Sequence, residues 1–212
     1  NLSQALVELG EFGDAFKAVS RALQIDPSLA EAHNQMAEIY RNIFKYDLAI
    51  SAYKKSLELR PTLYESMLGL ATVYRESEDV GAALEVLNRL IALEPRHAKA
   101  HAALGILKEQ VGDTVAAADC FKKSIQLAPD AVSPLYHLSQ IKGRIISQDE
   151  ILAMERLQKM TDLSSKDRSH VHFGLGEAYD QQGQTDKAFN AWLIANQDKA
   201  ESYPYDLDKR TS

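Results

Sequence analysis

Four prolines recur along this chain at a constant spacing and constrain its fold more than any other feature. They stand at Pro27, Pro61, Pro95 and Pro129, so that the interval from each proline to the next is identical. Proline cannot continue a helix, because it lacks the backbone N–H and its ring clashes with the preceding turn. Prolines at a fixed period of about 34 residues therefore mark the ends of a repeated structural unit. This spacing excludes one core of unrepeated topology for the first two-thirds of the chain.

The composition predicts that these units are helical. Ala and Leu dominate the 212 residues, whereas there are only 10 Gly and 6 Pro, so strong helix formers outweigh helix breakers. The formal net charge of −6 argues against a general nucleic-acid binder, which needs a basic face for phosphate contact. The longest stretch without Asp, Glu, Lys or Arg, 131–141, is shorter than the roughly 20 apolar residues of a membrane span. We therefore expect neither nucleic acid nor a membrane as a partner.

The chain has a single cysteine, Cys120. One cysteine forms no disulfide within the chain and no multi-cysteine metal site. A reducing compartment fits this usage, and we expect a cytoplasmic location. Beside Phe121 in a predicted helix, Cys120 is expected to be a small buried core residue. The chain starts inside a helical pattern without Met, so we expect a piece of a longer protein.

Superposing the segments 30–63, 64–97 and 98–131 aligns small and large residues at fixed positions of the period. Small residues stand at positions 8 and 20: Ala37, Ala71 and Gly105, then Ala49, Ala83 and Ala117. Large residues stand at position 24: Tyr53, Leu87 and Phe121. Small residues let two helices approach closely, and a large one fills the remaining space. Glycines recur at position 15, where a glycine can take the left-handed conformation that ends the first helix: Gly10, Gly112 and Gly183.

This pattern of small, small and large residues, with a proline once in each period, resembles the tetratricopeptide repeat family. The resemblance implies an all-α fold, a right-handed α-solenoid of about six helix–turn–helix repeats, in which each unit buries its apolar face against its neighbours. We place the solenoid at 1–202 and a tail, or a linker to a missing C-terminal domain, at 203–212. The expected repeats are 1–29 (truncated, with Leu2 and Leu6), 30–63, 64–97, 98–131, 132–168 (irregular, with helices near 133–142 and 148–160) and 169–202.

The resemblance also implies a concave groove lined by the first helix of each repeat, which suits an extended peptide or a partner helix. The predicted groove residues are Asn34, Glu38, Arg41, Asn42, Leu68, Thr72, Arg75, Lys99, Ala102, Ile106 and Glu109. Two specialised grooves of the family are disfavoured. The chaperone-tail clamp of Lys, Asn and Arg is matched only by Asn34 and Arg75, and the asparagine ladder of sugar-transferring members is missing. A solvated face without a ligand is the alternative.

The histidines are the candidate metal ligands of this chain. His33, His101 and His172 occupy one repeated position, where the family places a packing residue, so we expect a packing role. His97 and His101 are four residues apart, a spacing that can bind metal on a helix. Pro95 places His97 at or before the helix start, however, and no third ligand is near. We expect no metal, no cofactor and no catalytic residue in this chain.

The segment from Asp167 to Asp206 is similar to the last repeat of bacterial proteins in which a tetratricopeptide array precedes a sulfotransferase domain. The likeness rests on Asp167-Arg168-Ser169, Phe173-Gly174-Leu175-Gly176, Ala188-Phe189 and Tyr205-Asp206. It implies that a catalytic domain using phosphoadenosine phosphosulfate (PAPS) follows Ser212 and that this chain carries none of its cofactor site.

We therefore expect a non-enzymatic protein-interaction scaffold. Its partner would be a protein or peptide in the groove, or its own missing C-terminal domain. The alternative is a free-standing adaptor or assembly factor, present as a monomer or as an end-stacked dimer.

Overall fold

The computed structural model describes residues 12–202 as helices joined by short turns, with no strand in this range. The helices are α2 (Phe12–Ile25), α3 (Ala30–Asn42), α4 (Tyr46–Leu59), α5 (Tyr64–Glu76), α6 (Val80–Leu93), α7 (Ala98–Gln110), α8 (Thr114–Leu127), α9 (Val132–Ser139), α10 (Gln148–Leu157), α11 (Ser165–Gln181) and α12 (Thr185–Ser202). None of them is both long and apolar enough to cross a lipid bilayer. The predictions for Leu2, Leu6, Gly10 and the tail 203–212 lie outside the described residues.

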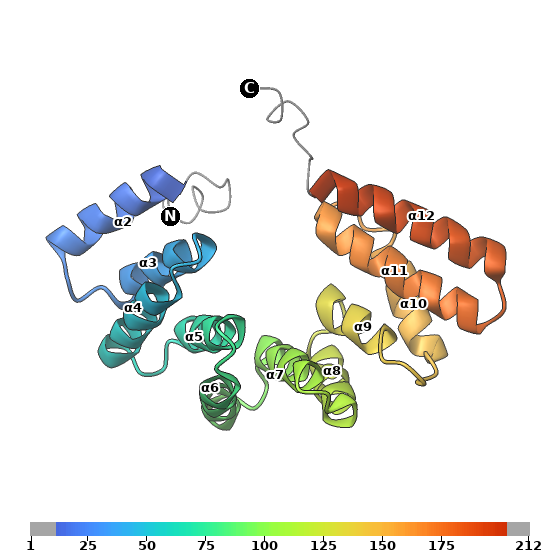
Figure 1. Cartoon of the computed structure of the whole chain (residues 1–212), viewed down its shortest axis with the longest axis horizontal. Helices are drawn as coiled ribbons and strands as arrows, with labels where there is room; N and C mark the ends of the chain where they lie inside the picture. The colour runs from blue at the N-terminus through green and yellow to red at the C-terminus, as the bar shows by residue number, and fades with distance from the viewer. Residues whose placement is uncertain (1–11, 203–212) are drawn as a thin grey trace. The chain divides into compact units, whose positions relative to one another are not determined.

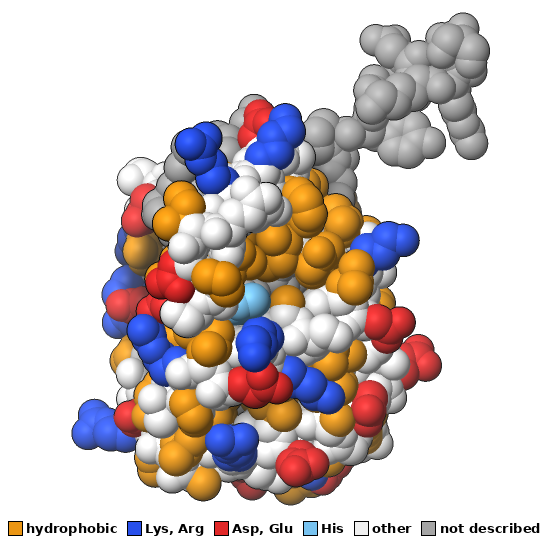
Figure 2. All heavy atoms as spheres, turned by 90° about the vertical axis from the view of Figure 1, so that its left-hand side faces the viewer, with side chains coloured by type: hydrophobic (Ala, Val, Ile, Leu, Met, Phe, Trp, Pro, Cys, Tyr) orange, Lys and Arg blue, Asp and Glu red, His pale blue; other side chains and the backbone are white. Residues whose placement is uncertain are grey.

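The chain divides into two compact units, residues 1–107 and 108–212. In the first unit each helix packs on its sequence neighbour from α2 to α6, and α3 also contacts α5 (Figure 1). Acidic, basic and apolar side chains are interspersed on the side of this unit that carries α2 to α4 (Figure 2). In the second unit α9 contacts α8, α10 and α11, and α11 packs along α12.

The small and large residues of the period occupy the positions predicted for them. Ala37, Ala49, Ala83 and Ala117 are fully buried, and so are the large residues Tyr53 and Phe121. In the last helix pair Gly176 permits close approach, because a Cβ there would lie 2.9 Å from Trp192 Cε2. The small residues of the period therefore stand where two helices approach each other closely.

The turn after each first helix needs a left-handed residue at position 15 of the period. Gly112 and Gly183 have φ of +83° and +72° there. Phe44 and Glu78, the equivalent residues of the two preceding repeats, have φ of 58° and 64°. Since this conformation costs an L-residue roughly 1–2 kcal/mol, the turn geometry is imposed by packing of the two helices and not by glycine alone.

Polar groups set several helix starts. The side chains of Asp79 and Asp113 accept hydrogen bonds from the backbone N–H of Ala82 and Ala116, at 3.0 and 3.2 Å. His97 lies just before α7, as predicted, and its Nδ1 accepts from the Ala100 N–H at 3.1 Å. The same N–H also donates to the His97 carbonyl at 3.0 Å, so His97 supplies both acceptors for this first-turn donor of the helix.

The irregular segment 132–168 contains α9, α10 and the first residues of α11, and α9 and α10 are both shorter than predicted. Helix α9 ends at Ser139 and not near 142. Gln140 is its C-cap, and the chain turns at Gly143, whose φ is +76°. Helix α10 begins after Ser147, which forms a reciprocal capping box with Glu150. Its end at Leu157 falls short of the predicted 160.

Candidate functional site

Ten of the eleven predicted groove residues lie on three first helices of the first unit. Helix α3 carries Asn34, Glu38, Arg41 and Asn42, α5 carries Leu68, Thr72 and Arg75, and α7 carries Lys99, Ala102 and Ile106. All but the exposed Lys99 are half-buried. Helices α3 and α5 are in contact, and Leu68 packs against a cluster that includes Ala100 of α7. The structure therefore brings these residues together on neighbouring helices.

A cluster of charges lies at the α3 end of this surface. Arg41 Nη2 and Nε donate to Glu38 Oε2 at 2.8 and 3.2 Å, and Arg41 Nη1 lies 3.4 Å from Glu76 Oε1. Arg75 Nη2 lies 3.6 Å from the same oxygen. Half-buried pairs of this kind are less screened by solvent than exposed ones. The cluster joins α3 to α5 and places acidic and basic groups side by side.

Tyr53 of α4 adds a hydroxyl to this cluster that sequence analysis did not foresee. It was assigned only a packing role, yet its hydroxyl donates to Glu38 Oε1. Burial, and then the neighbouring Glu38 charge, raise the pKa of Tyr53 well above its usual value. Burial alone would lower the pKa of Arg41, but Glu38, Tyr53 and Glu76 together outweigh burial, and the pKa of Arg41 is raised. Arg41 therefore stays cationic and Tyr53 stays a donor at neutral pH.

Three polar groove residues make hydrogen bonds within the protein. Asn42 Nδ2 donates to the Glu38 carbonyl at 2.9 Å, and Thr72 Oγ1 donates to the Leu68 carbonyl at 2.8 Å. Asn34 lies 2.8 Å from Ser66 Oγ, at the end of a buried chain of hydroxyl groups. Toward α7 the surface becomes apolar, with Leu68, Ala102 and Ile106. The surface as a whole is thus ion-paired at one end and apolar at the other.

Glu109, the remaining groove residue, lies in the second unit. Its Oε2 is 2.8 Å from His137 Nδ1 of α9. The His137 ring stacks on Phe121 with centroids 5.4 Å apart, and the neighbouring Tyr136 stacks on His170 of α11 at 4.2 Å. Burial, followed by the Lys166 charge, lowers the pKa of His170. The irregular spacing of 132–168 hid this ring cluster from sequence analysis.

The three repeated histidines make hydrogen bonds within the protein, but they do not all bond to the same kind of partner. His33 and His101 each place Nε2 2.9 Å from the carbonyl oxygen of the preceding proline, Pro27 and Pro95 respectively. His172 is buried, with Nδ1 2.9 Å from Asp198 Oδ2. Between residues 12 and 202 no three or more His, Cys, Asp and Glu side chains gather as metal ligands would.

Cys120 is half-buried and not fully buried, which corrects the expectation of a core position. Burial raises the pKa of its thiol, so the residue is mostly in the unreactive thiol form at neutral pH.

The residues that carry the sulfotransferase likeness tie α11 to its neighbours. Arg168 Nε donates to Asp198 Oδ1 at 2.9 Å, and Arg168 Nη2 donates to Glu201 Oε2 at 2.7 Å. Gly174 makes room for Met154, whose Sδ would be 2.5 Å from a Cβ at this position. These contacts hold α11 against α10 and α12.

Comparison with known proteins identifies the repeats. Models of the tetratricopeptide repeat match residues 30–63 and residues 70–134. No curated protein sequence matches this chain.

Several solved structures share the fold. A crystal structure of MamA matches with TM-score 0.54 and 21% identity over 97% of this chain and 98% of that chain. PilF of Pseudomonas aeruginosa matches with TM-score 0.69 and 17% identity over 99% of this chain and 92% of that chain. A chain of the APC/C hetero-tetramer Cut9–Hcn1 matches with TM-score 0.75 and 19% identity over 92% of this chain and 38% of that one. The predicted fold class, an all-α tetratricopeptide solenoid, is confirmed.

Proposed function

Because residues 30–63 and 70–134 are tetratricopeptide repeats, we propose that this chain is a non-catalytic scaffold that binds a protein or peptide partner on the first-helix surface of its first unit. The observation that carries the proposal is the alignment of ten half-buried or exposed residues on α3, α5 and α7, graded from ion-paired to apolar. A half-buried apolar row beside a fixed polar cluster suits an extended segment with one apolar and one polar end.

The apolar end supplies the affinity in this proposal. Leu68 and Ile106 are half-buried side chains of neighbouring helices, and covering them removes apolar area from water at about 25 cal/mol per Å². The charged cluster supplies orientation. Arg41 and Glu38 are already paired, so a partner gains from them chiefly by hydrogen bonding to their remaining lone pairs and N–H groups.

The experiment selects peptides from a random display library on the purified chain and measures the affinity of the best binder. Leu68→Glu and Ile106→Glu should each weaken binding at least tenfold, because each buries a charge against the apolar part of the peptide. Leu93→Glu is the matched control, since Leu93 is 45% exposed at the end of α6. Far-UV circular dichroism checks that helicity is retained. Equal affinity of wild type and both groove variants would reject this surface.

A more specific form of the proposal makes the chain the N-terminal part of a sulfotransferase-like protein, presenting substrate to a catalytic domain. It rests on the similarity of the segment from Asp167 to Asp206 to the last repeat of the proteins in which a sulfotransferase domain follows the array. Titration of the isolated chain with PAPS in a calorimeter should give no binding heat, since the cofactor site would lie beyond Ser212. Tight binding would contradict that placement.

The second candidate function is a free-standing adaptor that self-associates. The exposed apolar side chains of α12, with Phe189 64% and Leu193 48% exposed, favour it because an uncovered repeat face is adhesive. Light scattering that gives a concentration-independent monomer mass would reject self-association. We also propose a reducing compartment such as the cytoplasm, which the single thiol of Cys120 supports.

A further inference from the structure

The first helices of the second unit present a row of half-buried rings. Tyr136 and His137 of α9 and His170 and Phe173 of α11 are all half-buried. The Tyr136 and His170 rings stack with centroids 4.2 Å apart and planes 5° apart, and α9 packs against α11. Phe173 stands three residues after His170 and therefore lies on the same side of α11. Rings held by such packing keep their rotamers, so a partner that covers them costs the protein little ordering entropy.

Two carboxylates border these rings. Glu109 Oε2 is 2.8 Å from His137 Nδ1. Glu177 stands seven residues after His170, which is about two full helix turns, so it lies on the same side of α11. Burial is the main cause of the raised pKa of Tyr136, and the charges of Glu109 and Glu177 raise it further because both lie near its hydroxyl. Within residues 12–202 Glu109 is paired only with His137, and Glu177 forms no ion pair.

The charge of this surface differs from that of the first-unit groove. The predicted groove residues stand at positions 2, 5, 9, 12 and 13 of the period. On α3, α5 and α7 these positions include the cations Arg41, Arg75 and Lys99. At the end of α7 and on α9 and α11, the same positions include Glu109, Glu177 and Asp180 and neither Lys nor Arg. The first-helix surface of the second unit is therefore acidic.

The basic residues around this surface leave its carboxylates without a cation. Arg144, in the turn after α9, is paired with Glu150 of α10. Lys166 and Lys199 act at the other end of the surface, where their charges, after burial, lower the pKa of His170. Half-buried carboxylates are less screened by solvent than exposed ones, so a cation brought by a partner gains more from them than from carboxylates in open solvent.

From the row of rings and the two carboxylates beside it, we propose that the first-helix surface of the second unit binds a basic segment of a partner protein through an arginine side chain. The guanidinium group stacks on the rings beside Tyr136 and pairs with Glu109 and Glu177. Arginine fits better than lysine, because its planar and weakly hydrated guanidinium both stacks on rings and donates two parallel hydrogen bonds to a carboxylate. The proposal extends the scaffold function to the second unit and does not depend on the first-unit groove.

The test measures fluorescence anisotropy of a labelled, end-blocked peptide, Gly-Arg-Ser-Arg-Leu-Arg-Ser-Arg-Gly, titrated with the purified chain. The same peptide with lysines or with glutamates for the arginines provides the two comparison probes. The arginine peptide should bind at least about tenfold more tightly than the glutamate peptide and at least about threefold more tightly than the lysine peptide, and its affinity should fall as salt is raised. Equal binding of the lysine peptide, or no saturable binding of the arginine peptide, overturns the proposal.

A pair of double variants locates the binding. Glu109→Gln with Glu177→Gln should weaken binding of the arginine peptide at least about tenfold. Asp119→Asn with Asp162→Asn is the matched control, because it removes two exposed carboxylates of the same unit, and it should change the affinity less than about twofold. Equal loss in the two double variants would show that only the net charge of the chain matters and would overturn the location.

Two single variants test the rings and the independence of this surface. Tyr136→Leu keeps an apolar side chain but removes the ring, so the preference for arginine over lysine should disappear; an unchanged preference would overturn the stacking. Leu68→Glu, in the first-unit groove, should leave the affinity for the arginine peptide unchanged, and an equal loss there would reject two separate surfaces. Far-UV circular dichroism checks that each variant retains its helicity.

Discussion

Replacing Gly69 by alanine tests how tightly α5 packs against α4. A Cβ on Gly69 would lie 2.5 Å from both Cε1 and Oη of Tyr53, well inside the contact distance of two carbon atoms. The Tyr53 ring is fully buried, and its hydroxyl is bonded to Glu38. The ring therefore has no space to retreat, and the helices must separate.

Two opposing effects set the magnitude. Overpacking of this kind costs about 1–3 kcal/mol, whereas alanine is favoured over glycine inside a helix by about 1 kcal/mol. We expect Gly69→Ala to destabilise the chain by up to about 2 kcal/mol. Gly81→Ala is the control, because a Cβ at Gly81 of α6 meets only Asp79 Oδ1, at 3.8 Å. It should be neutral or stabilise by up to about 1 kcal/mol.

The chain itself supplies the compensating change. One period later in the sequence, Leu87 and Ala103 stand where Tyr53 and Gly69 are, and the two residues pack in one cluster. In a Tyr53→Leu background the overpacking is relieved, so Gly69→Ala should stabilise by about 1 kcal/mol, giving a coupling energy of about 1–3 kcal/mol. Urea unfolding followed by far-UV circular dichroism gives the four free energies of the cycle. An equal cost of Gly69→Ala in both backgrounds would refute the packing argument.

Three further predictions concern stability. Ala83→Trp should destabilise by about 1–3 kcal/mol or more, because Ala83 is fully buried between helices; a urea midpoint equal to wild type would contradict it. Glu78→Gly should stabilise by about 1 kcal/mol and Gly112→Ala should destabilise by a similar amount, since both positions are left-handed; opposite signs in urea unfolding would count against the turn geometry. The pKa of His170 is lowered, so the unfolded chain takes up a proton first and stability declines as pH falls through about 6.5. His170→Phe should reduce this decline between about pH 7.5 and about pH 5.5, and an unchanged slope would show that other groups cause it.

The sequence predicted the helix pairs because their contacts repeat at one period. Ala49 and Ala83 could be assigned to close helix approach without a structure, since only a small side chain is compatible with that position in each unit. The left-handed turns at Phe44 and Glu78 were missed for a related reason. Neither residue type signals positive φ, and the conformation is imposed by packing between the two helices.

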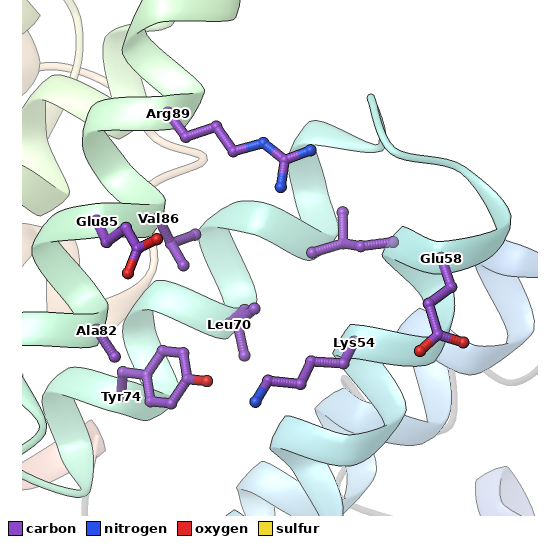
Figure 3. Close-up of a pocket in the computed structure, with 9 residues that line it drawn as sticks. Lys54, Glu58, Leu70, Tyr74, Ala82, Glu85, Val86 and Arg89 are labelled. Carbon is purple, nitrogen blue, oxygen red and sulfur yellow. The ribbon is translucent and has the colours of Figure 1, made fainter.

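The surface chemistry was less accessible to sequence reasoning. The positions of Glu38 and Arg41 within the period placed them on one helix face. These positions did not predict that Tyr53, on another helix, donates to Glu38. The pocket of about 470 Å³ between α4, α5 and α6 (Figure 3) depends on how three successive helices approach one another. The ring cluster around His137 lies where the register of the repeats breaks, so no offset could be assigned there.

The buried hydroxyl groups near Asn34 also determine which atom that residue offers to a partner. Ser56 Oγ lies 2.8 Å from the Ala30 carbonyl oxygen and 2.7 Å from Ser66 Oγ, which lies 2.8 Å from the Asn34 side chain. Ser66 Oγ donates to Asn34 Oδ1, so the amide oxygen of Asn34 is the atom that faces the hydroxyl groups. The NH₂ group of the same side chain carries two N–H donors. A partner at this end of the surface must therefore bring an acceptor, such as a carbonyl or carboxylate oxygen.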